Sequence, residues 1–383
     1  MNLKKVFKKD NVFQYLVILK NTHILICIKD KFIESRNLRD FEIDWKNENY
    51  CRLGTFTIQN NLKVSNSQLK GKFISIENGN VNHEVGEKFE NYICNKYFKN
   101  MGLLGSIGEP IISALYDLQT DKILWEREYI NDVWGIHEKG IYARGDKMES
   151  VEFYSLENGS HLWQYSVSEI GKYTDTDNYF KPYQHEGEVR KIIGVCGDIL
   201  LVVISGGFEG KNNVSSQLIG LSCQSGELLW RLDMFNSNGI YTGYGSYENL
   251  QIDESNHRLL GFYSQGFIEI DAKLGKVKRF CHLSYTNKEM LQFYHQERLL
   301  TNVYAETLVG EHLYFKATNI ANKRHSLSSN VIGAYNHQTE KIDWLYEFID
   351  LGPSVSIRES PKVEGNRLYA LDSGSTLHIF ERE

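Results

Sequence analysis

Proline is scarce in this chain, with 4 residues among 383. No Ser/Gly tract and no long block of charge interrupts the sequence either, and such segments are the usual sign of a linker between domains. Length alone would suggest two or three domains. The missing linkers instead predict that residues 1–383 form a single domain.

The chain lacks an excess of positive charge, because its formal net charge is −6. A protein that binds nucleic acid usually presents a clustered basic face to the phosphates. The composition therefore argues against a nucleic-acid partner, and mildly favours a partner with a basic surface.

Long apolar runs are absent as well. Residues 13–19 and 24–28 are apolar, but the polar residues 20–23 separate them, so neither run is long enough to span a bilayer. The apolar core is also too short for a secretory signal, and no small-x-small cleavage site follows it. We expect no membrane partner and a cytoplasmic location.

The cysteines show none of the spacings that suggest disulfide or metal chemistry. No CxxC motif and no adjacent pair occurs among them, which predicts buried free thiols in a reducing compartment. The six are Cys27, Cys51, Cys94, Cys196, Cys223 and Cys281.

Recognisable catalytic motifs are missing too. The segment 205–211 (SGGFEGK) resembles a phosphate loop, but Ser205 replaces the first glycine and Asn212 follows the lysine where Ser or Thr would hold Mg²⁺. No HExxH zinc motif and no GxSxG nucleophile elbow occurs. We therefore predict no catalytic residues, no metal and no cofactor.

What the chain does contain is a repeated phrase of eleven residues. An alternating strand leads into a turn rich in Thr, Ser, Asn and Gly, and a second short strand carries a large side chain at a fixed distance after the turn. The five copies are LYDLQTDKILW (115–125), FYSLENGSHLW (153–163), GLSCQSGELLW (220–230), EIDAKLGKVKR (269–279) and AYNHQTEKIDW (334–344). One hairpin cannot bury its apolar face alone, so the copies must stack, and the repetition predicts a β-propeller.

The phrase resembles the repeat of the pyrroloquinoline-quinone-type (PQQ-like) propeller family, A-x-D-x-x-T-G-K-x-x-W. The first copy carries Asp117, Thr120, Lys122 and Trp125 at the matching places, whereas the fourth has Arg279 where the family has Trp. The resemblance implies four-stranded blades with the Trp wedged between neighbours. It covers roughly residues 110–350 and none of the positions that bind the quinone in that family, so it implies the fold rather than the cofactor.

The repeat anchors set the number of blades. Trp45 gives a degenerate sixth anchor, and the interval 46–112, about twice a blade's length, is expected to form one enlarged blade. We expect seven blades, with six and eight as alternatives. In the interval 46–112, residues 85–101 place Phe89, Ile93, Tyr97 and Met101 at spacings of four, which predicts a short amphipathic helix.

The two ends of the chain are expected to share one blade. Residues 366–372 and 376–381 read as inner strands, and the chain stops where an outer strand is due. Residues 1–7 can supply that strand, which would leave no sheet edge open.

Segments that depart from the strand pattern are expected to be loop insertions, at 171–188, 205–217, 236–248 and 284–298. Two of them, 171–188 and 236–248, are rich in Tyr, Gly, Asn, Ser and Thr. Tyrosine offers a large rigid contact surface with a polar tip, while Gly, Ser and Asn adapt, as in antibody paratopes. The predicted partner contacts are Tyr173, Asp175, Asp177, Tyr179, Tyr183, Tyr241, Tyr244, Tyr247 and Glu248.

Two functional hypotheses follow. In the first, the chain is a non-enzymatic protein-binding propeller that is monomeric on its own. A sharper form of this hypothesis, drawn by analogy, is that the chain is an immunity protein and that its partner is a bacterial toxin, which it neutralises. In the second, the chain is an enzyme or small-ligand receptor that uses the central channel. Polar side chains from several blades that converge on one pocket would favour the second hypothesis.

Overall fold

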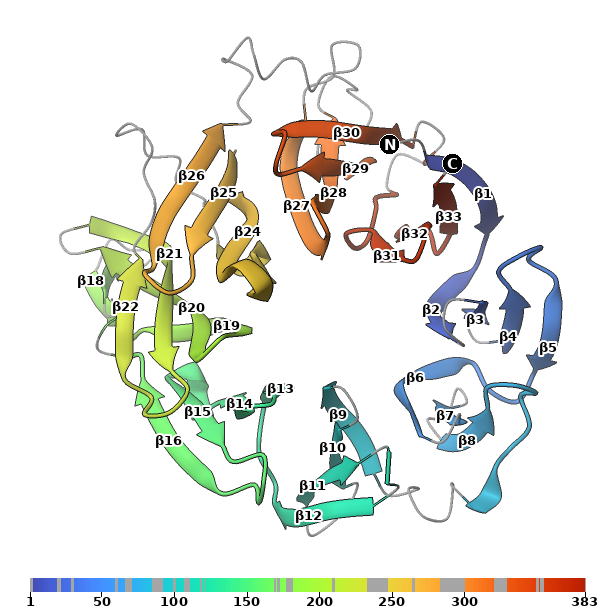
Figure 1. The fold of residues 1–383 in the computed structure, drawn as a ribbon, viewed down its shortest axis with the longest axis horizontal. Coiled ribbons are helices and arrows are strands. Elements are labelled where there is room, and N and C mark those ends of the chain that lie inside the picture. Colours follow the sequence, from blue (N-terminus) through green and yellow to red (C-terminus); the bar gives the residue numbers. More distant parts are fainter. Residues whose placement is uncertain are drawn as a thin grey trace.

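The computed structural model shows eight antiparallel sheets arranged as a ring around a common axis (Figure 1). It describes residues 3–18, 22–28, 31–58, 61–65, 71–84, 92–98, 101–106, 111–117, 119–120, 122–168, 170, 173–176, 182–208, 211–232, 247–263, 266–282, 300–319, 329–348, 351 and 355–382. The all-β propeller predicted from the repeats is therefore confirmed.

The first four blades are antiparallel meanders that run outward from the axis. Blade 1 holds β2 (Val12–Ile18), β3 (His23–Ile28), β4 (Phe32–Asn37) and β5 (Ile43–Asn47). Blade 2 holds β6 (Arg52–Ile58), β7 (Asn61–Ser65) and β8 (Gly71–Ser75). Blade 3 holds β9 (Tyr92–Phe98), β10 (Met101–Ser106), β11 (Ile112–Asp117) and β12 (Lys122–Glu128). Blade 4 holds β13 (Val133–His137), β14 (Gly140–Arg144), β15 (Ser150–Tyr154) and β16 (His161–Ser166), with the 3-10 turn η1 (Asp146–Met148).

The other blades follow the same plan. Blade 5 holds β19 (Glu188–Cys196), β20 (Ile199–Phe208), β21 (Lys211–Ser222) and β22 (Leu228–Leu232), and a separate hairpin of β17 (Tyr173–Thr176) and β18 (Pro182–His185) precedes it. Blade 6 holds β23 (Gln251–Asp253), β24 (Arg258–Tyr263), β25 (Gly266–Asp271) and β26 (Lys276–His282), with η2 (Tyr247–Asn249) and η3 (Glu254–Asn256). Blade 7 holds β27 (Leu300–Val309), β28 (His312–Asn319), β29 (Val331–Asn336) and β30 (Lys341–Glu347).

Blade 8 joins the two ends of the chain, as the sequence predicts. Its order is β31 (Lys362–Glu364), β32 (Arg367–Leu371), β33 (Leu377–Arg382) and then β1 (Leu3–Lys9). The register pairs Leu3 with Arg382 and Lys9 with Leu377, so the first strand completes the last sheet. This pairing closes the ring through hydrogen bonds.

The ring has eight blades. Seven were expected from the sequence, with six and eight as alternatives, so the larger alternative is the observed one. The interval 46–112 is not one enlarged blade, because it contains all of blade 2 and the first two strands of blade 3. Blade 2 escapes the repeat count because it has three strands, and its fourth is reduced to a single bridge between Ile74 and Val81.

The helix predicted within 85–101 is wrong over 92–98, where the chain forms strand β9. Residues 85–91 and 99–100 lie outside the described part. A spacing of four places residues on one face of a strand as well as one face of a helix, because four is a multiple of the strand period of two. The spacing of Ile93 and Tyr97 therefore could not separate the two structures.

Each copy of the repeated phrase forms a turn of the same geometry between the two outer strands of a blade. The first turn residue is Asn, Asp or Ser, and its side chain accepts the backbone N–H two residues later, as from Glu157 to Ser155 at 3.2 Å. The fifth residue has a positive φ, which favours glycine. The same turn occurs at Asn37 in blade 1 and at Ser75 in blade 2. The fifth residues that the structure describes are Phe41, Gly79, Gly159, Gly226, Gly275 and Glu340, and residue 121 of the first copy lies outside the described residues.

The repeat tryptophans lock adjacent blades together, which confirms the packing role predicted for them. In four of them the indole N–H donates to the carbonyl of the second turn residue in the next blade, whereas Trp344 contacts Phe380 of blade 8 edge to face, at 5.5 Å between ring centroids. The pairs are Trp45 to Ile76 at 2.9 Å, Trp125 to Leu156 at 2.9 Å, Trp163 to Cys223 at 2.8 Å and Trp230 to Ala272 at 3.1 Å. A Cβ on the turn glycine would lie 2.3–2.9 Å from the indole, so the ring needs a glycine beneath it.

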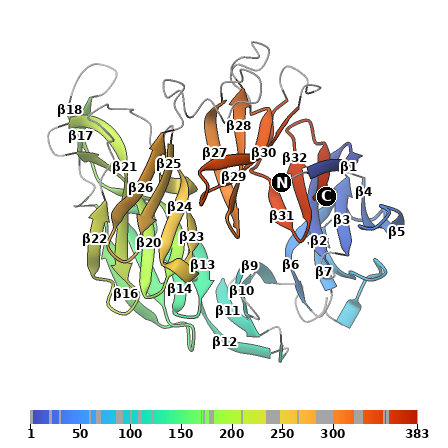
Figure 2. The same cartoon turned by 45° about the horizontal axis from the view of Figure 1, so that its top comes forward.

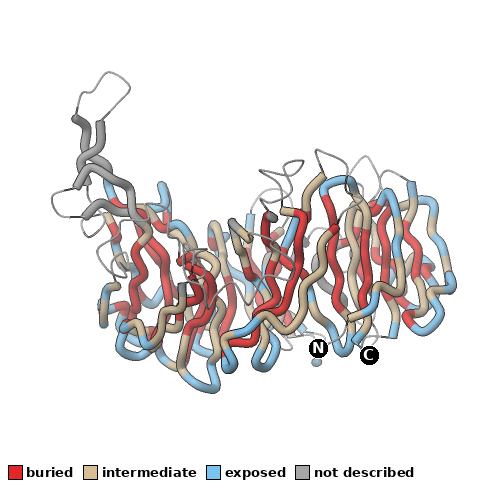
Figure 3. The backbone as a smooth tube through the Cα atoms, turned by 90° about the horizontal axis from the view of Figure 1, so that it is seen from above, coloured by how far each residue is buried: buried red, intermediate tan, exposed pale blue. Residues whose placement is uncertain are grey.

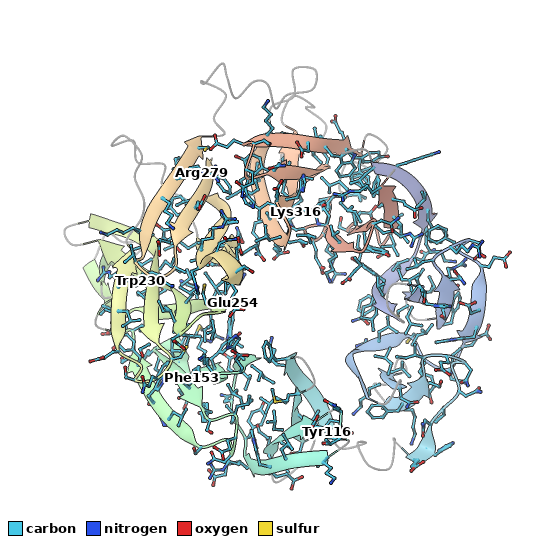
Figure 4. All side chains as sticks on the ribbon, viewed as in Figure 1. Tyr116, Phe153, Trp230, Glu254, Arg279 and Lys316 are labelled. Atoms are coloured by element: carbon cyan, nitrogen blue, oxygen red, sulfur yellow. The ribbon has the colours of Figure 1, made fainter. Side chains whose placement is uncertain are left out.

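Arg279 performs the same task where the repeat lacks its tryptophan. Its guanidinium donates to the His337 carbonyl at 2.7 Å, in the same place as the indole bonds, and forms an ion pair with Glu340 at 2.9 Å. Figure 4 shows Arg279 in the outer part of the ring, between β26 and β30. Glu340 occupies the turn position that is glycine in the four tryptophan seams. The Trp–Gly pair is thus replaced as a unit by an Arg–Glu pair.

The cysteine side chains that the structure describes agree with the prediction of free thiols. Cys27, Cys51, Cys196 and Cys223 are buried and form no disulfide, and Cys281, also outside any disulfide, is half-buried. The side chain of Cys94 lies outside the described residues. Burial raises the pKa of Cys196 to about 11 and that of Cys223 to about 12.

These pKa values predict that the buried thiols resist alkylation in the folded protein. The thiolate is the reactive form, and a pKa of about 12 leaves it a minor species at pH 8. Mass spectrometry after brief iodoacetamide treatment should find Cys196 and Cys223 unmodified in the native protein and modified after unfolding in guanidinium. Full native labelling of Cys223 would contradict its buried placement.

Candidate binding face

The two ends of the ring differ in what they carry. Because each blade is a meander, connections alternate between the ends. The repeat turns and the N- and C-terminal strand ends fall on one end, which we call the turn face. Links from one blade to the next, and the link between the two middle strands of each blade, fall on the opposite end, which we call the insertion face (Figure 3).

All four predicted insertions fall between strands whose ends lie on the insertion face, although residues 236–246 and 284–298 themselves lie outside the described residues. Residues 171–188 precede blade 5, residues 205–217 form the tip of its central hairpin, and residues 236–248 follow it. Residues 284–298 link blades 6 and 7. Three of the four segments therefore adjoin blade 5 along the chain, and the strands that flank them end at the same end of the ring.

Blade 5 is also lengthened toward the insertion face. Residues 205–217, expected as a loop insertion, largely continue β20 and β21 as a paired ribbon, from Ser205 opposite Ser216 to Phe208 opposite Lys211. Strand β21 has 12 residues, whereas β22 of the same blade has 5. The hairpin β17–β18 lies against β20 and β21, beyond the rim of the ring (Figures 1 and 2).

Three of the predicted contact residues belong to this hairpin. The register places Tyr173 opposite His185. Two residues further along β17, Asp175 lies opposite Tyr183. Strand periodicity assigns these four positions to the same face of the hairpin. The predicted contacts Asp177, Tyr179, Tyr241 and Tyr244 lie outside the described residues.

Tyr247 is a correction to the predicted contact set. Its side chain is completely buried and stacks on Tyr263 at 4.6 Å between ring centroids. Its backbone N–H donates to the Ser216 hydroxyl at 3.3 Å. Tyr247 therefore anchors the end of the insertion 236–248 in the core and cannot contact a partner.

Glu248 is half-buried beside this anchor. Its backbone carbonyl accepts a hydrogen bond from the Lys191 ammonium at 2.5 Å. The bond ties the end of the insertion to β19, the inner strand of blade 5. Sequence composition could not reveal either anchor, because a tyrosine in a Tyr-rich loop looks the same whether it faces solvent or the core.

Charged groups from blades 6, 7 and 8 approach one another on the inner side of the ring. Burial raises the pKa of Tyr304 to about 12, and the nearby carboxylates Glu306 and Glu248 add to the shift. Burial lowers the pKa of the Lys316 ammonium, while Glu306 and Glu359 oppose that shift. Lys316 lies toward the axis in Figure 4. The second hypothesis requires such groups to converge on one pocket, and of these residues Glu359 lines a cavity described below.

Two cavities flank blade 8. One of about 320 Å³ lies between blades 8, 1 and 2 and includes Arg358 and Lys362. The other, of about 260 Å³, lies between blades 7 and 8 near the chain ends and includes Arg367 and Arg382. Within the described ranges, no three His, Cys, Asp or Glu side chains gather as metal ligands. The same part of the chain contains no helix that could cross a membrane.

Comparison with known proteins supports the propeller fold. No family model and no curated protein matches the sequence. BamB from Moraxella catarrhalis is similar in structure over 100% of this chain and 98% of its own, with a TM-score of 0.53 and 10% identity. The computationally designed protein Ika8 is similar over 97% of this chain and 96% of its own, with a TM-score of 0.52 and 11% identity. At these identities the likeness concerns the fold alone.

Proposed function

We propose that this chain is a non-enzymatic binding propeller that holds a protein partner on its insertion face. The observation that carries the proposal is that three insertions adjoin blade 5 in the chain, between strands that end opposite the chain termini. A closed ring gives such segments a rigid base, and binding residues concentrate on loops that a scaffold positions.

The chemistry of the insertions suits a protein surface. Residues 171–188 and 236–248 combine tyrosines with Gly, Asn, Ser and Thr, the composition that gives large contacts at low entropic cost. Asp175 and Asp177 and the net charge of −6 favour a partner with a basic patch. We propose Tyr173, Tyr179, Tyr183, Tyr241 and Tyr244 as the contact tyrosines.

The sharper form of the proposal is an immunity role in which the partner is a toxin. It is motivated by analogy, and by the suitability of variable loops on an invariant ring for changing specificity. A captured partner that is toxic alone and harmless with this chain would support it. A captured partner without toxicity would remove the immunity role and leave protein binding in place.

Replacing Tyr241 and Tyr244 together with Ala should abolish most of the partner's binding. Aromatic hot spots contribute about 2 kcal/mol or more each, so affinity should fall by at least about 100-fold. The test is affinity capture from cells of the source, with stoichiometry by mass spectrometry and Kd by titration of the purified partner.

A matched control lies on the turn face. Leu274 is 60% exposed in the turn between β25 and β26, so Leu274→Ala removes apolar surface from the opposite end of the ring. The proposal predicts full binding by this variant. Equal retention of the partner by the double Tyr variant, or loss of binding in Leu274→Ala alone, would refute the assignment of the face.

A further inference from the structure

The cavity between blades 8, 1 and 2 has an apolar wall and a polar rim. Its volume is about 320 Å³, at the small end of the range for ligand sites. Phe13, Leu16, Leu53 and Leu371 supply the wall. The residues lie near the insertion-face ends of β2, β6, β31 and β32.

The rim holds one more cation than it holds anions. Lys362 and Glu359 form an ion pair at 3.4 Å and offset one another. Arg358 is exposed, and its guanidinium has no hydrogen bond or ion pair among the described residues. One positive charge, with its planar set of N–H donors, is therefore available to the cavity.

Gln14 adds a second donor with a fixed orientation. Its side-chain oxygen accepts a hydrogen bond from the backbone N–H of Leu53 at 3.0 Å. The NH₂ end of the amide is therefore the end that can donate to a ligand. Within the described chain this NH₂ has no hydrogen-bond partner. The Arg358 guanidinium, this NH₂ and the hydroxyl of Tyr15, which also lines the cavity, can all donate, which suits an acceptor with negative charge.

The backbone that carries Arg358 is held from both sides. Its N–H donates to the Leu371 carbonyl at 2.9 Å, and its carbonyl accepts the Lys316 ammonium at 2.9 Å. The next hydroxyl along, that of Ser360, donates to the Tyr304 carbonyl at 2.9 Å. A guanidinium on a fixed backbone loses less entropy on binding a ligand.

We propose that this cavity binds a carboxylate that carries a short apolar arm. The carboxylate pairs with Arg358, whose planar donors match its two oxygens, and accepts from the Gln14 amide. The arm packs on Phe13, Leu16 and Leu53. One surplus charge fits a monoanion, and the volume fits either a small organic acid or the C-terminal residue of a polypeptide.

Titration of the intact protein with hexanoate, followed by ligand-observed NMR, tests the proposal. Hexanoate should bind, whereas hexylamine, with the same arm and opposite charge, and acetate, with no arm, should bind at least tenfold more weakly. Equal binding of hexylamine and hexanoate, or no binding of hexanoate at millimolar concentration, would overturn the proposal.

Two variants locate the site. Arg358→Gln should weaken hexanoate binding at least tenfold, and Arg39→Gln, which removes an exposed arginine from the turn face, should leave it unchanged. Gln14→Glu keeps the acceptor for Leu53 but replaces the donor with a negative oxygen, so it should also weaken binding at least tenfold. Unchanged binding in both Arg358→Gln and Gln14→Glu would show that the acid binds elsewhere.

Titration with peptides distinguishes the two sources of the carboxylate. The peptide Gly-Ser-Gly-Leu with a free C-terminus should bind if the site takes a chain end, and its amidated form should not. If hexanoate binds and neither peptide does, the site takes a small organic acid. Equal binding of both peptide forms would overturn the proposal that the site recognises a carboxylate. The site does not depend on the insertion-face partner, so either proposal can fail without the other.

Discussion

Replacing Trp163 with Ala should lower the free energy of unfolding by about 3–5 kcal/mol. The indole is 8% exposed and stacks on Phe153 at 4.9 Å between ring centroids. It also donates to the Cys223 carbonyl at 2.8 Å, across the seam between blades 4 and 5. The substitution therefore opens a cavity and leaves a carbonyl unpaired at the same seam.

The neighbouring residue on the same strand is a matched control. Leu162 is 51% exposed, so Leu162→Ala should change stability by no more than about 0.5 kcal/mol. Urea unfolding curves of the three proteins, followed by tryptophan fluorescence and circular dichroism, measure the effect. A loss below about 1 kcal/mol in Trp163→Ala would show that the repeat tryptophans do not hold the blades together.

Replacing Arg279 with Trp should destabilise the protein, even though it restores the residue of the repeat. The indole would meet the side chain of Glu340, which occupies the place that is glycine beneath the other tryptophans. The change also removes the ion pairs of Arg279 with Glu340 and Glu269. Overpacking of this kind costs about 1–3 kcal/mol.

Adding Glu340→Gly should rescue much of that loss. Glycine provides room for the indole and relieves the positive φ of 58° at this position. Unfolding free energies of the two single variants and the double variant give a coupling energy, expected at about 1–3 kcal/mol in favour of the pair. If the stability changes of the two single variants add to that of the double variant within about 0.5 kcal/mol, the Trp–Gly and Arg–Glu pairs do not replace one another as units.

The repeat made most of the fold predictable, because one physical device recurs at five seams between blades. The turn residue that caps its own backbone, the residue of positive φ and the large side chain have fixed spacings, so they can be recognised without structure. Blade 2 could not be counted this way. It keeps the turn at residues 75–79, but its fourth strand is a single bridge at Val81 and His83 stands where the repeat has Trp.

Closure of blade 8 was predictable from the edge that the chain would otherwise leave open. The predicted residues 1–7 largely coincide with the observed strand β1, and β33 needs a partner on its outer side. The helix expected within 85–101 failed because apolar residues four apart fit both periods. Only the pairing of β9 with β10 decides between them.

The candidate site was predictable in composition but not in place. Tyr-rich segments stand out from the strands, yet which end of the ring they share depends on the number and direction of the strands before them. Tyr247 shows the limit of composition, because its stacking on Tyr263 makes it part of the core. The hydrogen-bond donors around Arg358 could not be predicted from the sequence, because residues 14, 53 and 358 come together only when the ring closes.

Hydrogen–deuterium exchange of the chain with and without its captured partner tests the central claim most directly. Binding on the insertion face predicts slower exchange in residues 171–188 and 236–248, with unchanged exchange in the turns at residues 155–160 and 222–227. Protection confined to those turns and to the chain ends would place the partner on the turn face and contradict the account.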